Sequence, residues 1–130
     1  MSAYLATVNA FLELTSGAGA DIAAAMDLLT DDVQFIGPLM QTSGKDEYAS
    51  LLRQLSPTHA AARVLQQFVQ DENVCSIDEF VLRTPSGGTL TLVMAEWFRL
   101  QGGKIAEHRV FYDPRDFAAA FRVRALRRGP

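Results

Sequence analysis

The chain has 130 residues, a formal net charge of −3 and a single cysteine. This length suits one domain with a substantial core, the charge gives no general attraction to nucleic acid or anionic membranes, and one cysteine excludes an intrachain disulfide framework. No apolar run approaches the roughly 20 residues of a membrane span, and the N-terminal segment lacks the basic start of a signal peptide. We therefore expect a single cytoplasmic domain over residues 1–130.

Three helices are predicted in the first half of the chain. Apolar residues recur at helical spacing between Tyr4 and Leu12. Asp21 is placed to N-cap a second helix. Gly44-Lys45-Asp46 opens a third helix, whose buried face includes Tyr48. Between the second and third helices we expect a short strand at residues 33–36 and a loop at residues 38–43.

Four strands in a row dominate the second half. They are rich in β-branched, aromatic and large aliphatic residues and are predicted at residues 63–70, 74–84, 89–100 and 105–113. Glycines at 102 and 103 mark the turn between the last two strands, and Asp113 followed by Pro114 begins a closing helix. Helices segregated from such a meander indicate an α+β fold, in which a curved antiparallel sheet wraps around the N-terminal helices.

The strand at residues 89–100 is apolar on both of its faces. Leu92, Met94 and Phe98 alternate with Val93, Ala95 and Trp97. A sheet that is apolar on both faces must be covered on both sides. The chain's own helices supply one cover, and a second subunit is the natural candidate for the other.

Three segments carry a resemblance to a known superfamily. They are LLTDDVQFIGP at residues 28–38, Gly44-Lys45-Asp46, and WFRLQGGKIAEHRVFYDPRDF at residues 97–117. With them, nearly the whole chain resembles the nuclear transport factor 2 superfamily, and within it the SnoaL-like polyketide cyclases, ketosteroid isomerases and limonene epoxide hydrolases. The resemblance implies a cone-shaped fold with a deep apolar pocket for a small hydrophobic molecule, and a homodimer formed through the outer face of the sheet.

The known catalytic sets of these relatives do not transfer to this chain. Where the epoxide hydrolases hold a water with Tyr and Asn, this chain has Phe35 and Gly37. Their paired Arg and Asp match Ile77 and Glu79, and their second Asp matches Val110. The general-base Asp of the steroid isomerases also falls at about Gly37. The resemblance therefore implies neither epoxide hydrolysis nor steroid isomerisation by those mechanisms. The cyclase histidine has a counterpart in His108, without a matching Asp.

The resemblance also predicts which side chains face the pocket. Even-numbered positions of residues 89–100 point inward, as do Ala106, His108, Val110 and Tyr112. The expected walls and substrate contacts are Phe35, Tyr48, Phe68, Val81, Leu92, Met94, Val110 and Tyr112. We expect an enclosed pocket on the order of several hundred Å³. Val93, Ala95, Trp97 and Phe111 then point outward and form the dimer interface, with Arg99, Glu107 and Arg109 at its rim.

Glu79, Glu96 and His108 are the candidates for proton transfer. A three-residue loop places Glu96 directly across from His108, either as an acid–base pair or as a satisfied structural pair. We expect the carboxylate to raise the pKa of His108. Glu79 takes the place of the middle-strand acid, although Asp78 and Glu79 are adjacent and one of them must face outward.

These features leave two classes of function open. The first is a pocket enzyme that moves a proton on a polyketide-, terpene- or steroid-like substrate, as an isomerase, cyclase or hydratase does. The second is a non-catalytic module for ligand binding or dimerisation. The sequence has no HxH or HxxxH pair, glycine-rich phosphate loop or GxSxG elbow, so we expect no metal, no cofactor and no nucleic-acid partner.

Overall fold

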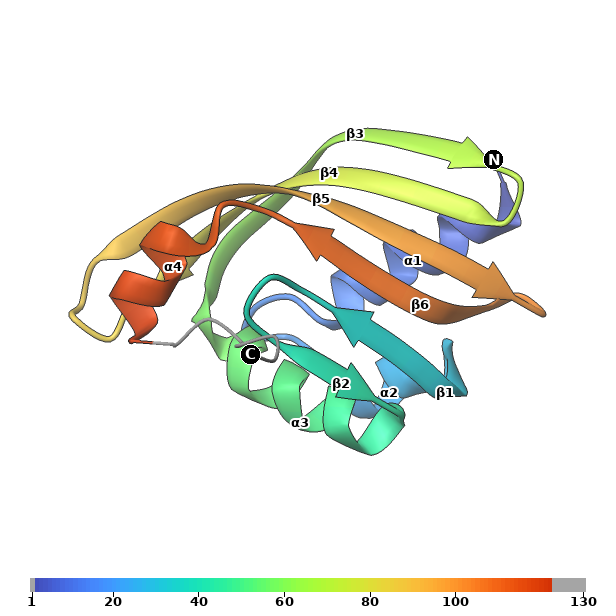
Figure 1. Cartoon of the computed structure of the whole chain (residues 1–130), viewed down its shortest axis with the longest axis horizontal. Helices are drawn as coiled ribbons and strands as arrows, with labels where there is room; N and C mark the ends of the chain where they lie inside the picture. Colours follow the sequence, from blue (N-terminus) through green and yellow to red (C-terminus); the bar gives the residue numbers. More distant parts are fainter. Residues whose placement is uncertain (1, 123–130) are drawn as a thin grey trace, which may run out of the picture.

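A computed structural model describes residues 2–122 of the chain. Its elements confirm the predicted α+β class (Figure 1). In chain order they are α1 (Ala3–Leu14), α2 (Ile22–Met26), β1 (Leu29–Ile36), β2 (Gln41–Ser43), α3 (Lys45–Leu55), the 3-10 turn η1 (Ser56–Thr58), β3 (His59–Gln70), β4 (Asn73–Arg83), β5 (Thr89–Gln101), β6 (Lys104–Phe111) and α4 (Pro114–Phe121).

The strands form one six-stranded sheet in the order β2-β1-β6-β5-β4-β3. The antiparallel meander from β3 to β6 is as predicted. Two details differ from the sequence prediction. First, β1 runs parallel to β6, so the sheet is not antiparallel throughout. Second, residues 41–43, expected in a loop, pair with β1 as β2, because a tight turn closed by the Gly37 N–H and the Met40 carbonyl returns the chain alongside β1.

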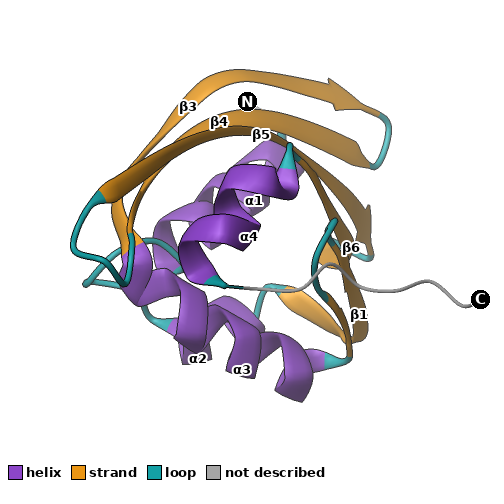
Figure 2. Ribbon diagram, turned by 60° about the vertical axis from the view of Figure 1, so that its left-hand side comes forward, coloured by secondary structure: helices purple, strands orange, loops and turns teal. Residues whose placement is uncertain are grey.

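The sheet curves into an arch over α1, and α3 lies across its open side (Figure 2). Register shifts interrupt the β3–β4 pairing between Val64 and Gln66 and the β5–β6 pairing between Arg99 and Leu100. Such irregularities bend and twist strands. The arch leaves a concave face toward the helices and a convex face toward solvent.

Side-chain caps fix the starts of α2 and α4. The Asp21 carboxylate accepts a hydrogen bond from the Ala24 N–H at 3.0 Å, and Asp113 accepts one from the Arg115 N–H at 3.1 Å with Pro114 at the first position of α4. Both caps were predicted. They satisfy backbone donors that have no partner within the helix.

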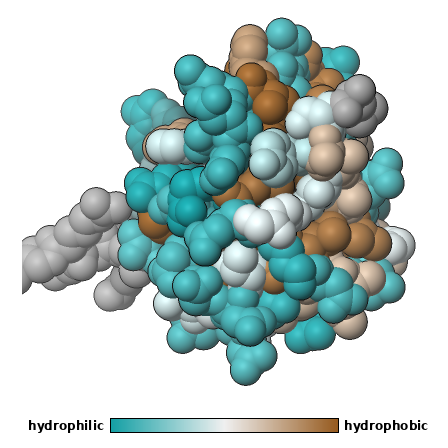
Figure 3. All heavy atoms as spheres, turned by 90° about the vertical axis from the view of Figure 1, so that its right-hand side faces the viewer, coloured by the Kyte–Doolittle hydropathy of each residue, from teal (hydrophilic) through white to brown (hydrophobic). Residues whose placement is uncertain are grey.

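The convex face of the sheet has the predicted alternation. Val93, Trp97 and Phe111 are 52%, 41% and 53% exposed, while Ala95 is half-buried. At the end of the molecule where β3 and β5 finish, hydrophobic patches also interrupt the hydrophilic surface (Figure 3). The outward parity of β5 and β6 is therefore confirmed.

Candidate functional site

A cavity of about 100 Å³ lies between the concave face of the sheet and the helices. Most of its lining is apolar and comes from α1, α3, β1 and the three strands β4 to β6. Eight of the predicted site residues line it: Phe35, Tyr48, Leu92, Met94, Glu96, His108, Val110 and Tyr112. The cavity is smaller than expected and only partly enclosed, because Phe11 and Tyr48 are fully buried side chains that fill much of the arch.

The predicted parity of β4 is wrong. Buried side chains on β4 alternate at Ser76, Asp78, Phe80 and Leu82, and Phe80 and Leu82 line the cavity. Val81 and Glu79 therefore point to the convex face. There the Glu79 carboxylate accepts a hydrogen bond from Arg63 Nε at 3.0 Å, so it is not a pocket acid.

The reason for this error lies in the connection between β4 and β5. Arg83 pairs with Thr89, which leaves five residues between the two strands instead of the four, residues 85–88, that the predicted strands leave. One residue of register moves every side chain of a strand to the other face. Phe68, expected in the pocket wall, pairs with Cys75 on the convex side and is 54% exposed.

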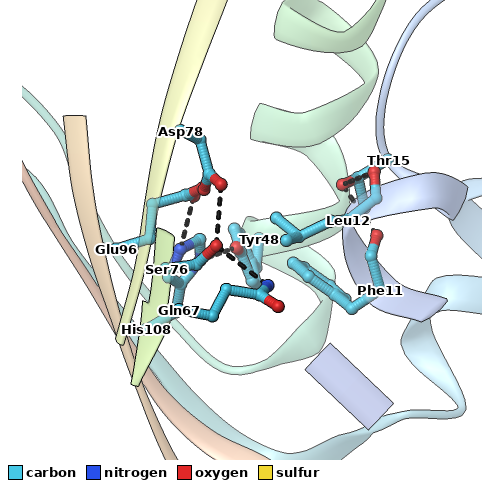
Figure 4. A network of polar contacts seen from close by, with 9 residues as sticks. All are labelled: Phe11, Leu12, Thr15, Tyr48, Gln67, Ser76, Asp78, Glu96 and His108. Carbon is cyan, nitrogen blue, oxygen red and sulfur yellow. Dashed lines mark hydrogen bonds and ion pairs between the residues drawn. The ribbon is translucent and has the colours of Figure 1, made fainter. Parts of the chain in front are cut away.

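Buried polar side chains form a continuous chain of contacts beside the cavity (Figure 4). Tyr48 Oη lies 2.5 Å from His108 Nδ1, and His108 Nε2 lies 2.9 Å from Glu96 Oε1. The Glu96 and Asp78 carboxyls point toward one another and are hydrogen-bonded. Ser76 Oγ donates to Asp78 Oδ1 at 2.7 Å. The inward-facing acid of β4 is thus Asp78, which the sequence analysis did not select.

Aromatic rings hold His108 in place. Phe98 lies directly opposite His108 on β5, and the two rings stack with centroids 4.1 Å apart. Phe35 and Phe11 present their rings edge-on at 5.3 and 5.9 Å. Glu96 is therefore the diagonal neighbour of His108 rather than its direct partner, because the turn at residues 102–103 is one residue shorter than predicted and the pairing shifts again after Arg99. The predicted contact between the two side chains still forms, since they share a face.

The imidazole of His108 is neutral. Burial lowers the pKa of His108 to about 3. The Asp78 carboxyl acts in the opposite direction and raises this pKa, but the effect of burial is larger. The predicted upward shift is therefore wrong, because full desolvation of the imidazolium exceeds the gain from one hydrogen-bonded acid. Burial also raises the pKa of Tyr48 well above 10. Tyr48 therefore keeps its proton and donates to Nδ1, which leaves Nε2–H to donate to Glu96.

Asp78 is the protonated member of two adjacent buried carboxyls at neutral pH. Asp78 and Glu96 are only 2% and 4% exposed. Burial, followed by the hydrogen bond and charge of Glu96, raises the pKa of Asp78 to about 8. Burial also raises the pKa of Glu96, whereas the hydrogen bond from Asp78 lowers it. Glu96 consequently ionises first and Asp78 keeps the proton, as expected for two adjacent carboxyls that resist carrying two charges.

The free carboxyl oxygens agree with this assignment. Among the described residues, Asp78 Oδ2 and Glu96 Oε2 are buried, and neither atom has a hydrogen-bond donor if both carboxyls are ionised. A proton on Asp78, donated to Glu96, removes this deficit. We refer to Asp78 and Glu96 as the acid pair.

Two further findings concern metal ligands and membrane spans. Over residues 2–122, no three His, Cys, Asp or Glu side chains gather closely enough to hold a metal ion. Over the same residues, no helix has the length and apolarity needed to cross a membrane.

Comparisons with solved structures show the fold. An NTF2-like protein of unknown function from Burkholderia pseudomallei K96243 is 20% identical with a TM-score of 0.80, covering 93% of this chain and 98% of its own. A putative SnoaL-like polyketide cyclase from Jannaschia sp. CCS1 is 18% identical with a TM-score of 0.80, covering 92% and 91%. TerC, co-crystallised with polyporic acid, is 16% identical with a TM-score of 0.78, covering 92% and 98%.

The family itself follows from the sequence comparison. A search of curated proteins gives no match. The family model described as the SnoaL-like domain matches residues 8–108, which include the acid pair, Tyr48 and His108. With this match and the cone-shaped NTF2-like fold, the chain belongs to the SnoaL-like domain family.

Proposed function

We propose that this protein binds a small hydrophobic molecule in the cavity and transfers a proton on it, as an isomerase, cyclase or hydratase does. The observation that supports the proposal is the 2.9 Å hydrogen bond between His108 Nε2 and Glu96 Oε1 at the wall of an apolar cavity. A carboxylate held in this way is oriented and poorly solvated. Both properties favour a general base.

Each side chain then has a definite role. Glu96 accepts a proton from the substrate, either from a carbon next to a carbonyl group or from a water molecule that adds to the substrate. His108 positions the Glu96 carboxylate through Nε2–H, and Tyr48 fixes the tautomer of His108 by donating to Nδ1. Because burial raises the pKa of Glu96, its carboxylate is a stronger base than one in water.

The cavity limits the size of the substrate. One water needs roughly 10–15 Å³ by the same measure of volume, so about 100 Å³ accommodates a ligand of roughly seven to ten heavy atoms. That is one ring of a polyketide-, terpene- or steroid-like molecule, with the rest outside or admitted by movement of lining side chains. The structural similarity to a putative polyketide cyclase and to TerC with polyporic acid is consistent with a ring-containing ligand.

One observation favours a different function. Both ring nitrogens of His108 are engaged within the protein, by Tyr48 and by Glu96, so neither is free to contact a ligand. A pocket whose polar groups satisfy one another suits a binding module that sequesters or senses an apolar ligand without changing it. The two functions differ in whether Glu96 exchanges protons with the ligand.

Proton exchange on single-ring ketones distinguishes them. Cyclohexenone and related enones are incubated with the protein in D2O, and NMR follows deuterium entering the carbon next to the carbonyl. We expect wild type and Glu107→Gln, a matched change on the convex face, to accelerate this exchange, and Glu96→Gln to lose the acceleration. Equal rates in Glu96→Gln and wild type would contradict the proposal. Binding of the enones without any exchange would favour the binding module.

A further inference from the structure

A second, larger cavity lies on the other side of the acid pair. It has a volume of about 430 Å³ and runs as an open groove between α1 and the strands β3 and β4. Its apolar walls include Leu12 and Val64, and its polar lining includes Asn9, Gln67 and Asp78. A groove of this size and polarity is filled by water in solution.

The acid pair separates this groove from the inner cavity. Asp78 lines the groove and not the inner cavity, whereas Glu96 lines the inner cavity and not the groove. The two carboxyls are hydrogen-bonded to each other, and both are almost completely buried. They are therefore two ends of one short path that begins at the substrate and ends at water.

Hydrogen bonds on the groove side hold Asp78 in this position. Gln67 Nε2 donates to Ser76 Oγ at 3.1 Å (Figure 4). The same nitrogen donates to Asn9 Oδ1 at 2.6 Å. The Ser76 hydroxyl in turn donates to Asp78 Oδ1. Because Oδ1 is engaged by Ser76, the acidic proton resides on Oδ2, the oxygen available to Glu96.

We propose that Asp78 is a proton relay, through which Glu96 exchanges protons with water in the groove while an apolar ligand occupies the inner cavity. This inference rests on the proposed role of Glu96 as the base. It explains how a base whose cavity is occupied by ligand regains its starting state without water entering beside the substrate.

The relay is balanced in atoms and charge. When the substrate C–H bond breaks, its electron pair stays on the substrate and its proton forms an O–H bond with Glu96. The acid pair then holds two protons. Asp78 releases its proton to a groove water, giving a hydronium ion, and takes the proton of Glu96, which restores the starting state. The reverse sequence supplies a proton to the substrate.

Other ionisable groups face each end of the path. On the groove side they are Glu13 from α1 and Arg63 from β3, and Arg63 is paired with Glu79. On the cavity side they are Tyr48 from α3, His59 at the start of β3, His108 from β6 and Tyr112. Glu13 and Arg63 lie where they can alter the relay without contacting the inner cavity.

Infrared spectroscopy of the ligand-free protein tests the relay directly. A protonated carboxyl has a C=O stretch that a carboxylate lacks, and the band shifts when its proton is replaced by deuterium. We expect this band in wild type, its loss as pH rises through about 8, and its absence in Asp78→Asn. A band that persists in Asp78→Asn, or one that does not titrate, would overturn the assignment of the proton to Asp78.

Closing the groove tests the route. Val64→Trp places a large ring in the groove, and Ala62→Trp does the same from a second position. After rapid mixing into D2O we expect the band to shift about tenfold more slowly in both variants. Phe68→Trp, which places the same ring at an exposed position on the convex face of β3, should exchange like wild type. Unchanged exchange in both groove variants, or slow exchange in Met94→Trp alone, would show that protons travel through the inner cavity instead.

These outcomes are independent of the proposed enzymatic function. If the enones exchange no deuterium but the groove variants slow the infrared shift, the relay stands and the enzyme proposal fails. If the enones exchange through Glu96 but the groove variants have no effect, the enzyme proposal stands and the relay is wrong.

Discussion

Replacing Asp78 by Asn should change the difference in stability between the variant and wild type in favour of the variant as pH rises. The amide that Asp78→Asn introduces has nearly the shape of the protonated acid and can keep both hydrogen bonds, donating to Glu96 and accepting from Ser76. It cannot ionise. The free energies of unfolding of the two proteins therefore differ in a pH-dependent way only through the proton of Asp78.

The sign follows from proton binding in the two states. The pKa of Asp78 rises from 3.8 to about 8 on folding, so between these values the folded chain holds a proton that the unfolded chain has lost. The contribution of Asp78 to the stability of wild type must then fall as pH rises through this window, and the fall ends above about pH 8. The neutral His108 contributes in the opposite direction below its ordinary pKa of 6.5, but it does so in both proteins and cancels in the difference.

The magnitude follows from the same quantities. One proton changes stability by 1.36 kcal/mol per pH unit, which over pH 6 to 8 gives at most about 2.7 kcal/mol, and about 2 kcal/mol once Asp78 itself begins to ionise. Urea unfolding of both proteins at pH 6, 7 and 8 measures the difference. Glu79→Gln, on the opposite face of β4, is the matched control and should run parallel to wild type. Parallel profiles for Asp78→Asn and wild type would refute the buried, protonated state of Asp78.

Three further predictions concern His108, the core and the convex face. His108 should remain neutral between pH 4 and 8, since its pKa is about 3, and ¹⁵N NMR should show the proton on Nε2; a titration near its ordinary pKa would contradict its burial. Phe98→Ala should lower the free energy of unfolding by about 3–5 kcal/mol in urea, because Phe98 is fully buried against His108; a loss below ~1 kcal/mol would mean that the core collapses around the site. We also propose that a second copy covers Val93, Trp97 and Phe111, so Trp97→Glu should convert dimers to monomers in light scattering; a monomeric wild type would exclude this interface.

The sequence predicted most of the fold because its signals agreed with one another. Caps at Asp21 and Asp113, the glycine turn at residues 102–103 and the apolar strands all indicated the same α+β architecture. On β5 the inward and outward sets were also assigned correctly. There the family resemblance predicted which residues face inward. The structure agrees, since Trp97 is exposed and its neighbour Glu96 is buried on the opposite face of the strand.

The same reasoning failed on β4 for a physical reason. Its residues from Val74 to Leu82 include apolar side chains on both faces, and the two acids Asp78 and Glu79 are adjacent, so the pattern gives equal support to either parity. The length of the connection between β4 and the correctly assigned β5 decides between them, and its Pro, Ser and Gly residues do not indicate whether four or five residues form it. One residue of register thus moved the candidate acid from Glu79 to Asp78.

The protonation of the site follows from competition among its groups, which a pairwise view of Glu96 and His108 omits. Taken alone, that pair would be expected to form an imidazolium and a carboxylate. With Asp78 adjacent, the acid pair carries one proton, and the imidazole of His108 carries only the single ring proton of its neutral form. One buried charge then remains, on Glu96. Burying one hydrogen-bonded charge is less unfavourable than burying three. A buried carboxylate that accepts from His108 on one side and from a titratable acid on the other is poised to gain or lose a proton near neutral pH, and the substitution at Asp78 measures that property before any substrate is known.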